Sequence, residues 1–314
     1  MANNLPVVNW VTLEGDFTDY RPAIGPDGEK VVFERSFNGE TQLYMVQDLQ
    51  GSSPEPLLPQ HGAFAQTRPD WNWVTDMIAL NISNDQGIVS IYTVNADGSY
   101  LTKIADTERY NYAQWAVLSP DSDNGFVVMN SSDLGDPKST LIDSVGSIIP
   151  GYKDMNGRDA NGKDVFGGMP AVFPGQSTLI AFAGQSKWTP ETRYNQNRNY
   201  IFLNTENSGV FNSSPMESSA SITTFDPNFQ GRAPSISPDG KFIAFESTRN
   251  LGYSIYLFNL SEPDNPAIQL TDTTIAPNAQ HPKFSPDGRR LIFCANNPEK
   301  EQSRIAWIDI SEYL

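Results

Sequence analysis

Short apolar runs separated by turn residues make up the chain, and no stretch shows the 3.6-residue periodicity of a long amphipathic helix. The runs are rich in β-branched and aromatic residues, as in Val31-Val-Phe33, Phe242-Ile-Ala-Phe245 and Leu291-Ile-Phe293. Glycine and proline, at 23 residues each, make turns frequent between them. The pattern therefore predicts an all-β protein with short strands.

One unit of this pattern repeats along the chain. Three nearly full copies have the form Pro-x-x-x-Pro-Asp-Gly followed by an apolar run, at residues 22–33, 234–245 and 282–293. Weaker copies lie near residues 68–80, 118–129 and 169–182. The second proline position is occupied by Pro26, Trp73, Pro120, Pro174, Pro238 and Pro286. Six copies, each of about 50 residues, are typical of four-stranded blades, of which β-propellers have about four to eight.

Further apolar segments complete each copy. A third strand is expected at 42–46, 90–94, 199–203, 254–258 and 304–308, and a shorter fourth strand at 101–104 and 267–271. The last copy reaches Leu314 without a fourth strand, whereas segment 9–13 resembles one. We therefore predict a single-domain, six-bladed β-propeller of four-stranded antiparallel blades over residues 1–314, closed by a strand at about 7–14 that pairs into the last blade. The blades are expected at about 20–60, 66–106, 112–152, 167–227, 231–274 and 280–314.

The Pro-Asp-Gly tripeptide is interpreted as a turn rather than a site. Proline fixes φ at the first turn position, aspartate tolerates the second position and hydrogen-bonds locally, and glycine takes a positive φ. The tripeptide should therefore join the innermost strand of a blade to the next strand outward.

The repeat resembles that of the TolB-like, Pro-Asp-containing β-propeller family, a WD40-like repeat, over roughly residues 7–314. The resemblance is clearest in residues 232–271, which contain Ser-Pro-Asp-Gly-Lys-Phe-Ile-Ala-Phe-Glu-Ser-Thr-Arg. The family includes periplasmic interaction propellers, the propeller domains of prolyl-peptidase-like enzymes, and oligogalacturonate lyases. Here there is no room for the α/β domain of TolB itself, no Gly-x-Ser-x-Gly of the peptidases, and only His281 where the lyases use several histidines around a metal. The resemblance therefore implies a propeller without an appended domain.

The charge balance disfavours two classes of partner. Lys and Arg number 21 against 37 Asp and Glu, which gives a net charge of −16 and an isoelectric point near 4.4. Such an acidic protein repels nucleic acid and anionic lipid. No stretch approaches the roughly 20 apolar residues that span a bilayer, so membrane insertion is not expected.

Cysteine and histidine are scarce. The single cysteine, Cys294, excludes an intrachain disulfide and lies in an apolar run where it should be buried. The two histidines, His61 and His281, leave little material for a metal site, and we assign no catalytic residue. Residues 1–4 lack the features of a signal peptide. The protein is expected to be cytoplasmic if Met1 is native, and periplasmic or extracellular if a signal peptide has been removed.

The first strand of each propeller blade lines the central channel, so the residues before the first proline of each unit should converge at one mouth. The residues expected there are Tyr20, Arg21, Arg68, Trp115, Arg232 and His281. Arginine offers a carboxylate two parallel donors. The mouth is therefore a candidate site for an anionic or hydroxyl-rich ligand, or for an acidic peptide segment. The alternative is that these arginines pair with acidic residues between blades.

A long loop at 185–199 should reach the same face. It contains Trp188, Arg193 and Tyr194, and such side chains favour protein recognition and sugar stacking. The alternative is a loop that packs only on itself.

Segment 154–164 repeats the unit Asn-Gly-x-Asp. The side-chain oxygens of Asp154, Asn156 and Asp159 make it a weak candidate for Ca²⁺, although it lacks the spacing and final glutamate of an EF-hand loop. The alternative is a pair of turns, with no cofactor.

Two functions remain from this reasoning. The leading one is a non-catalytic interaction module that docks a protein partner or peptide segment at the channel-mouth face. The alternative is a carbohydrate-active enzyme, a polysaccharide lyase or hydrolase, that acts on an oligosaccharide in the channel with His281 and an arginine. A lectin is a third class, but the copies do not share the aromatic residues that repeated sugar pockets need.

Overall fold

The computed structural model describes residues 5–12, 15–61, 64–106, 110–117, 124–130, 137–186, 198–218, 221–222, 224, 226–298 and 302–314. Apart from two 3₁₀ turns, η1 (Pro59–His61) and η2 (Ser311–Tyr313), its regular elements in these ranges are strands. None of the described helices has the length and apolar character needed to cross a lipid bilayer.

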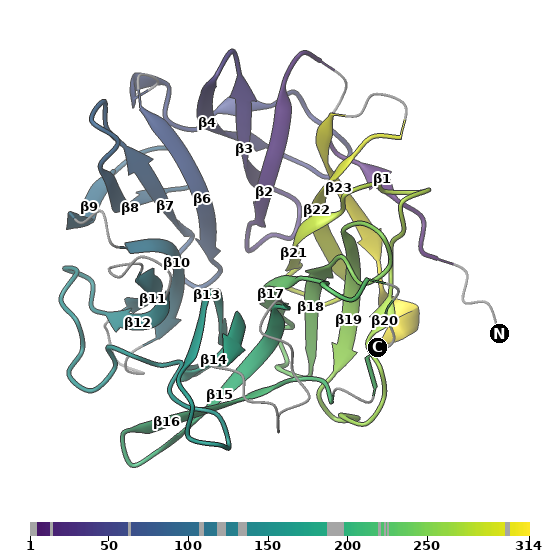
Figure 1. Cartoon of the computed structure of the whole chain (residues 1–314). Coiled ribbons are helices and arrows are strands. Elements are labelled where there is room, and N and C mark those ends of the chain that lie inside the picture. The colour runs from purple at the N-terminus through teal and green to yellow at the C-terminus, as the bar shows by residue number, and fades with distance from the viewer. Residues whose placement is uncertain are drawn as a thin grey trace.

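The strands form six antiparallel sheets arranged as a ring of blades, which confirms the predicted six-bladed propeller (Figure 1). Blade 1 contains β2 (Thr18–Ile24), β3 (Val31–Phe37), β4 (Glu40–Val46) and β5 (Glu55–Pro56), and blade 2 contains β6 (Ala65–Asn72), β7 (Met77–Ser83), β8 (Val89–Asn95) and β9 (Thr102–Asp106). Blade 3 contains β10 (Tyr110–Val117), β11 (Asn124–Asn130) and β12 (Lys138–Ile142), and blade 4 contains β13 (Val165–Phe173), β14 (Gln176–Ser186), β15 (Tyr200–Asn207) and β16 (Val210–Pro215). Blade 5 contains β17 (Gly231–Ile236), β18 (Phe242–Ser247), β19 (Ser254–Asn259) and β20 (Ile268–Gln269), and blade 6 contains β21 (Gln280–Phe284), β22 (Arg290–Asn296) and β23 (Ser303–Asp309).

The amino-terminal strand closes the ring, as predicted. β1 (Asn9–Trp10) pairs antiparallel with β23 of blade 6, with Trp10 opposite Ala306. Beyond β1, the Val11 N–H donates to the carbonyl of Ile305. The N–H of Ile305 in turn donates to Thr12 Oγ1 at 3.0 Å. The two ends of the chain therefore complete one blade together.

Two blades differ in detail from the expected repeat. In blade 3, backbone groups at 149–155 bond along the outer side of β12 in place of a regular fourth strand. In blade 4, part of the expected insertion at 204–221 is β16, the fourth strand of the sheet. The proposed turn residue Pro120 lies outside the described residues.

The Pro-Asp-Gly turns form as predicted. Gly28, Gly240 and Gly288 have φ values of 72°, 71° and 73°, and each amide donates to the carbonyl three residues earlier. Asp27 Oδ1 accepts the N–H groups of Glu29 and Lys30 at 2.9 and 3.0 Å. Each tripeptide is thus a tight turn at one end of the channel-lining strand.

The apolar core lies between neighbouring blades. The described buried residues form a cluster at each blade interface, so both faces of the middle strands are covered. Phe33 of blade 1 and Cys294 of blade 6, both fully buried, belong to the cluster that joins these blades. This packing holds the innermost strands at fixed positions around the channel.

Each innermost strand carries a β-bulge near its start, where the pairing with the second strand shifts. One residue per bulge has a left-handed φ of 43° to 55°, and we call these six residues the first ring: Arg21, Arg68, Tyr112, Met169, Ala233 and His281. Five of them precede a proline, which has no N–H to donate to the neighbouring strand.

The residues two positions further along, beyond each bulge, also face the channel. We call them the second ring: Ala23, Asp70, Gln114, Ala171, Ser235 and Lys283.

Candidate functional site

The first ring surrounds a narrow cavity of about 50 Å³, at the end of the channel where the innermost strands begin. All six first-ring residues line it, together with the prolines that follow five of them. Gln114 and Lys283 of the second ring also line this cavity, so they separate it from the rest of the channel.

Arg68 contributes a cationic side chain to the lining of this cavity. The neighbouring Arg21 Nη1 donates to both carboxylate oxygens of Glu34, at 3.2 and 2.9 Å. Glu34 also accepts the backbone N–H of Arg68 at 2.6 Å. The guanidinium of Arg68 lies 4.5 Å from the ring centroid of Tyr112, and its Nε is buried without a hydrogen-bond partner among the described residues. The described residues include no salt-bridge partner within 4.0 Å of Arg68, although the charge of Arg68 also acts on Glu34, the partner of Arg21.

The same arrangement recurs in blades 5 and 6. Glu246 accepts the backbone N–H of His281 at 2.8 Å, and its Oε1 lies 3.3 Å from Arg232 Nε. Arg232 Nη1 also donates to the hydroxyl of Tyr253 at 2.9 Å. His281 Nε2 lies 3.0 Å from the hydroxyl of Tyr20, and the two rings meet edge to face. His281 is therefore held from several sides.

The pKa of His281 reflects its burial and the positive charges around it. Burial lowers its pKa well below the ordinary histidine value, and four nearby cations lower it further, namely Arg21, Arg232, Lys283 and Arg68. The imidazole therefore stays neutral at pH 7.

The buried acids only partly offset these cations. Burial raises the pKa of Glu34 and of Glu246, against the opposing pull of their arginine partners. Among the described residues, four cations face three carboxylates here, the third being that of Asp70. The centre of the channel is thus electropositive within a chain that carries a net charge of −16.

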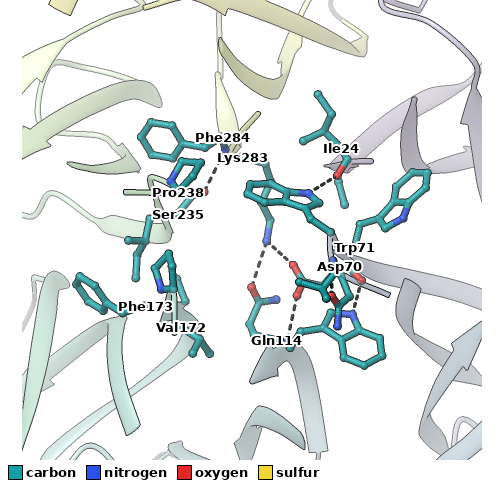
Figure 2. Close-up of a pocket in the computed structure, with 18 of the residues that line it drawn as sticks. Ile24, Asp70, Trp71, Gln114, Val172, Phe173, Ser235, Pro238, Lys283 and Phe284 are labelled. Atoms are coloured by element: carbon teal, nitrogen blue, oxygen red, sulfur yellow. Dashed lines mark hydrogen bonds and ion pairs between the residues drawn. The ribbon is translucent and has the colours of Figure 1, made fainter. Parts of the chain in front are cut away.

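The second ring lines a wider cavity of about 310 Å³, shown in Figure 2. Three second-ring residues have small side chains that leave space open, namely Ala23, Ala171 and Ser235. Lys283 crosses the channel, and its Nζ donates to Asp70 Oδ1 at 2.9 Å and to Gln114 Oε1 at 3.2 Å. This polar bridge joins blades 6, 2 and 3.

Aromatic rings form much of the wall of the wide cavity. The indole N–H groups of Trp71, Trp73 and Trp115 donate within the protein, to Asp76 Oδ1, the carbonyl of Ile24 and the carbonyl of Asp70. The tryptophans therefore offer a ligand their ring surfaces. Further lining residues are Phe173, Ile236, Pro238 and Phe284.

The predicted channel-mouth residues fall at four places. Arg21, Arg68 and His281 line the narrow cavity, and Tyr20 contacts His281. Arg232 lines a neighbouring cavity of about 280 Å³. Trp115 lines the wide cavity, three residues beyond the first-ring member of its strand. The predicted pairing of arginines with acids occurs at Arg21 and Arg232.

Two other sites were predicted from the sequence, the loop at 185–199 and the calcium segment at 154–164. Trp188, Arg193 and Tyr194 lie outside the described residues. In the proposed calcium segment, Asp154 pairs with Lys138, and Asp159 accepts two backbone amides of its own turn. Asn156 is fully buried, and its Oδ1 accepts the N–H of Ser139 at 2.6 Å. The described residues contain no group of three His, Cys, Asp or Glu side chains placed to hold a metal ion.

Sequence reasoning missed the second ring. The signal was present, because Asp70 and Lys283 lie two residues after first-ring members on strands predicted to line the channel. It also missed Tyr112, because blade 3 has Ala113 where five blades have proline, and the copy was aligned instead on Pro120.

Comparison with known proteins gives the fold. No protein-family model and no curated protein matches this chain. Among solved structures, oligogalacturonate lyase from Vibrio parahaemolyticus is 11% identical, with a TM-score of 0.56 over 99% of this chain and 96% of that one. A gluconolactonase from Xanthomonas campestris is 14% identical, with a TM-score of 0.54 over 98% and 95%. TolB from Acinetobacter baumannii is 16% identical, with a TM-score of 0.52 over 95% and 65%. Enzymes and TolB thus share this propeller fold, and a fold alone does not assign a function.

Proposed function

We propose that this protein is a non-catalytic binding propeller, which docks a partner protein at its channel mouth through an acidic segment of the partner. The observation that carries this proposal is Arg68, a first-ring cation for which the described residues include no salt bridge, because the nearby Glu34 carboxylate is paired with Arg21. Its neighbours Arg21 and Lys283 add to the positive field. The narrow cavity of about 50 Å³ has room for a carboxylate group. A carboxylate is the planar acceptor that arginine binds best.

The surroundings of the mouth support a protein partner. The cavity of about 280 Å³ beside the first ring is lined by Met129, Phe166 and Met169, with Gln185 and Arg232 among its polar residues. Apolar centres with polar margins are typical of protein interfaces, and methionine adapts its shape to different partners. An acidic segment could therefore place apolar side chains here while its carboxylate enters the first ring.

A carbohydrate-active enzyme is the second candidate, favoured by the contact between His281 and Tyr20 beside two arginines. A neutral histidine can accept a proton from a substrate. We rank this function second because the hydroxyl of Tyr20 already occupies His281 Nε2, and because burial raises the pKa of that hydroxyl.

Fluorescence anisotropy with a labelled Asp/Glu-rich peptide and its Asn/Gln counterpart tests the proposal. We expect the acidic peptide to bind and the amide peptide not to. Arg68→Gln should weaken binding at least about tenfold through loss of a charge-assisted hydrogen bond. The matched variant Arg289→Gln, at an exposed position, should leave it unchanged. Equal binding of both peptides would overturn the docking proposal. Turnover of oligogalacturonate or gluconolactone that His281→Asn abolishes would replace it with the enzyme.

A further inference from the structure

We infer that the wide cavity is a second, separate binding site, which takes a small amphipathic carboxylic acid with its apolar body among the tryptophan rings and its carboxylate at Lys283. This inference goes beyond the docking function, because the wide cavity is distinct from the narrow cavity that the first ring surrounds.

The walls of the cavity select an apolar body of aromatic size. Its volume of about 310 Å³ reaches the lower end of the range of small-molecule pockets, roughly 300 to 1,000 Å³. Trp71 and Phe173 are largely buried, and the ring surfaces of Trp73 and Trp115 are partly exposed. Since the three indole N–H groups are already bonded, a flat apolar group gains contact area here without leaving a donor unsatisfied.

The deep end of the cavity selects a negative charge. An ammonium group has three N–H donors, and the contacts of Lys283 with Asp70 and Gln114 account for two of them, so one remains among the described residues. Asp70 uses its Oδ1 for Lys283 and its Oδ2 for the backbone N–H of Trp115. The arginines of the first ring line the narrow cavity on the far side of this bridge. A ligand carboxylate would therefore gain a charge-assisted hydrogen bond from Lys283, whereas a ligand ammonium would meet a group of like charge there.

The ligand would enter from the end opposite the arginine mouth. Val74 is 89% exposed, and Pro174 and Gly175 are also exposed at the rim of the wide cavity. The bridge from Lys283 to Asp70 and Gln114 stands between this cavity and the narrow one, since Lys283 and Gln114 line both. A small acid can thus occupy the wide cavity while the mouth is engaged by another molecule.

Three probes that share one apolar body test the inference: 3-phenylpropanoate, its uncharged amide, and 3-phenylpropylammonium. Binding is measured by tryptophan fluorescence, since three of the six tryptophans line the cavity, and by saturation-transfer NMR. We expect the acid to bind at least about tenfold more tightly than the amide, as a charge-assisted hydrogen bond predicts. The ammonium should bind most weakly. Equal binding of the three probes would overturn the inference.

Variants of residues that line the wide cavity test whether the acid binds there. Val172, which lines the cavity, can be replaced by a ring that fills it, so Val172→Trp should weaken binding of the acid at least about tenfold. The double variant Asp70→Asn/Lys283→Met removes both members of the ion pair and should make the acid and the amide bind alike. Lys241→Met, at an exposed lysine, is the matched control and should change nothing. Circular dichroism checks that each variant folds, and Lys283→Arg, which keeps the charge, should retain the preference for the acid.

The two sites are distinguished by crossed variants. Arg68→Gln should weaken binding of the acidic peptide at least about tenfold and change the affinity for 3-phenylpropanoate by no more than about fivefold, the effect of a distant, partly screened charge. Val172→Trp should have the reverse pattern. If Val172→Trp leaves binding of 3-phenylpropanoate unchanged, the acid binds elsewhere and the inference is wrong, whatever the result with the peptide.

Discussion

Glu246 of blade 5 accepts the backbone N–H of His281 of blade 6 at 2.8 Å, across the interface between the blades. Glu34 of blade 1 makes the same contact with Arg68 of blade 2 at 2.6 Å. Both glutamates occupy the same register in the second strand of their blade, opposite Arg232 and Tyr20. These buried carboxylates hold first-ring residues by the backbone and pair with neighbouring arginines.

Removing such a carboxylate should destabilise the protein. Glu246→Ala leaves the Arg232 guanidinium and the His281 amide without their partner, which costs about 3 kcal/mol in the free energy of unfolding. Glu246→Gln should cost less, because an amide oxygen can still accept the N–H. Urea unfolding measures both, with the exposed Asp264→Asn as control. A loss below about 1 kcal/mol in Glu246→Ala would contradict this account of the first ring.

His281 should make stability depend on pH. Its pKa is lowered in the folded state, so below pH about 6.5 the unfolded chain binds a proton at this residue that the folded chain does not. The free energy of unfolding should therefore fall as the pH decreases below about 6.5, by up to about 1.4 kcal/mol per pH unit. Glu34 and Glu246 have the opposite effect. Because their pKa values are raised in the folded state, the folded chain binds protons at these residues more readily than the unfolded chain, which stabilises the folded state as the pH decreases toward the ordinary pKa of glutamate.

Comparison with His281→Asn isolates the histidine contribution. Asparagine tolerates the left-handed φ of 52° at this position, so the bulge should be kept. The stability difference between the natural protein and the variant should shrink or reverse from pH 7 to pH 5. A difference that is constant with pH would show that His281 titrates normally.

Closure of the ring should depend on Thr12. Its Oγ1 accepts the N–H of Ile305, and its side chain is buried. Thr12→Val keeps the shape but leaves that N–H unsatisfied, which should cost about 1 to 3 kcal/mol. Thermal unfolding measures the effect, and Thr18→Val, at an exposed position, is the control. Equal midpoints for the two variants would argue against a role for this bond in closure.

Cys294 should be chemically inert in the folded protein. Burial raises the pKa of its thiol to about 12, and its Sγ contacts the carbonyl of Gln280 at 3.4 Å. Iodoacetamide reacts with the thiolate, so at pH 8 it should label Cys294 only after unfolding in urea. Mass spectrometry of the native and the unfolded protein decides this, and rapid labelling of the native protein would contradict the packing between blades 1 and 6.

The fold could be predicted because its repeat is local in sequence. Turn chemistry at Pro26, Pro238 and Pro286 marks the same step in three blades, and the spacing gives the number of blades. In blade 3 the repeat was aligned at the wrong residues, because Ala113 stands where the bulges of the other blades have proline. Of the residues predicted for the mouth, Arg21, Arg68 and His281 line the narrow cavity, whereas Trp115 lines the wide cavity.

The contacts inside the channel could not be predicted in the same way. Lys283 and Asp70 are 213 residues apart, and nothing near either residue specifies the other. Their pairing depends on the lateral positions of blades 6 and 2 around the ring. The wide cavity likewise arises from small second-ring residues in separate blades, Ala23, Ala171 and Ser235, whose combined effect appears only when the ring is closed.

Photo-crosslinking shows directly whether an acidic segment docks at the first ring. An Asp/Glu-rich peptide that carries a benzophenone group is irradiated with the natural protein and with Arg68→Gln, and the crosslinked residues are identified by mass spectrometry. If an acidic segment docks there, we expect crosslinks near Tyr112 and Met169, where the innermost strands begin, and their loss in Arg68→Gln. Crosslinks on the outer strands, or an unchanged pattern in the variant, would contradict docking at the first ring.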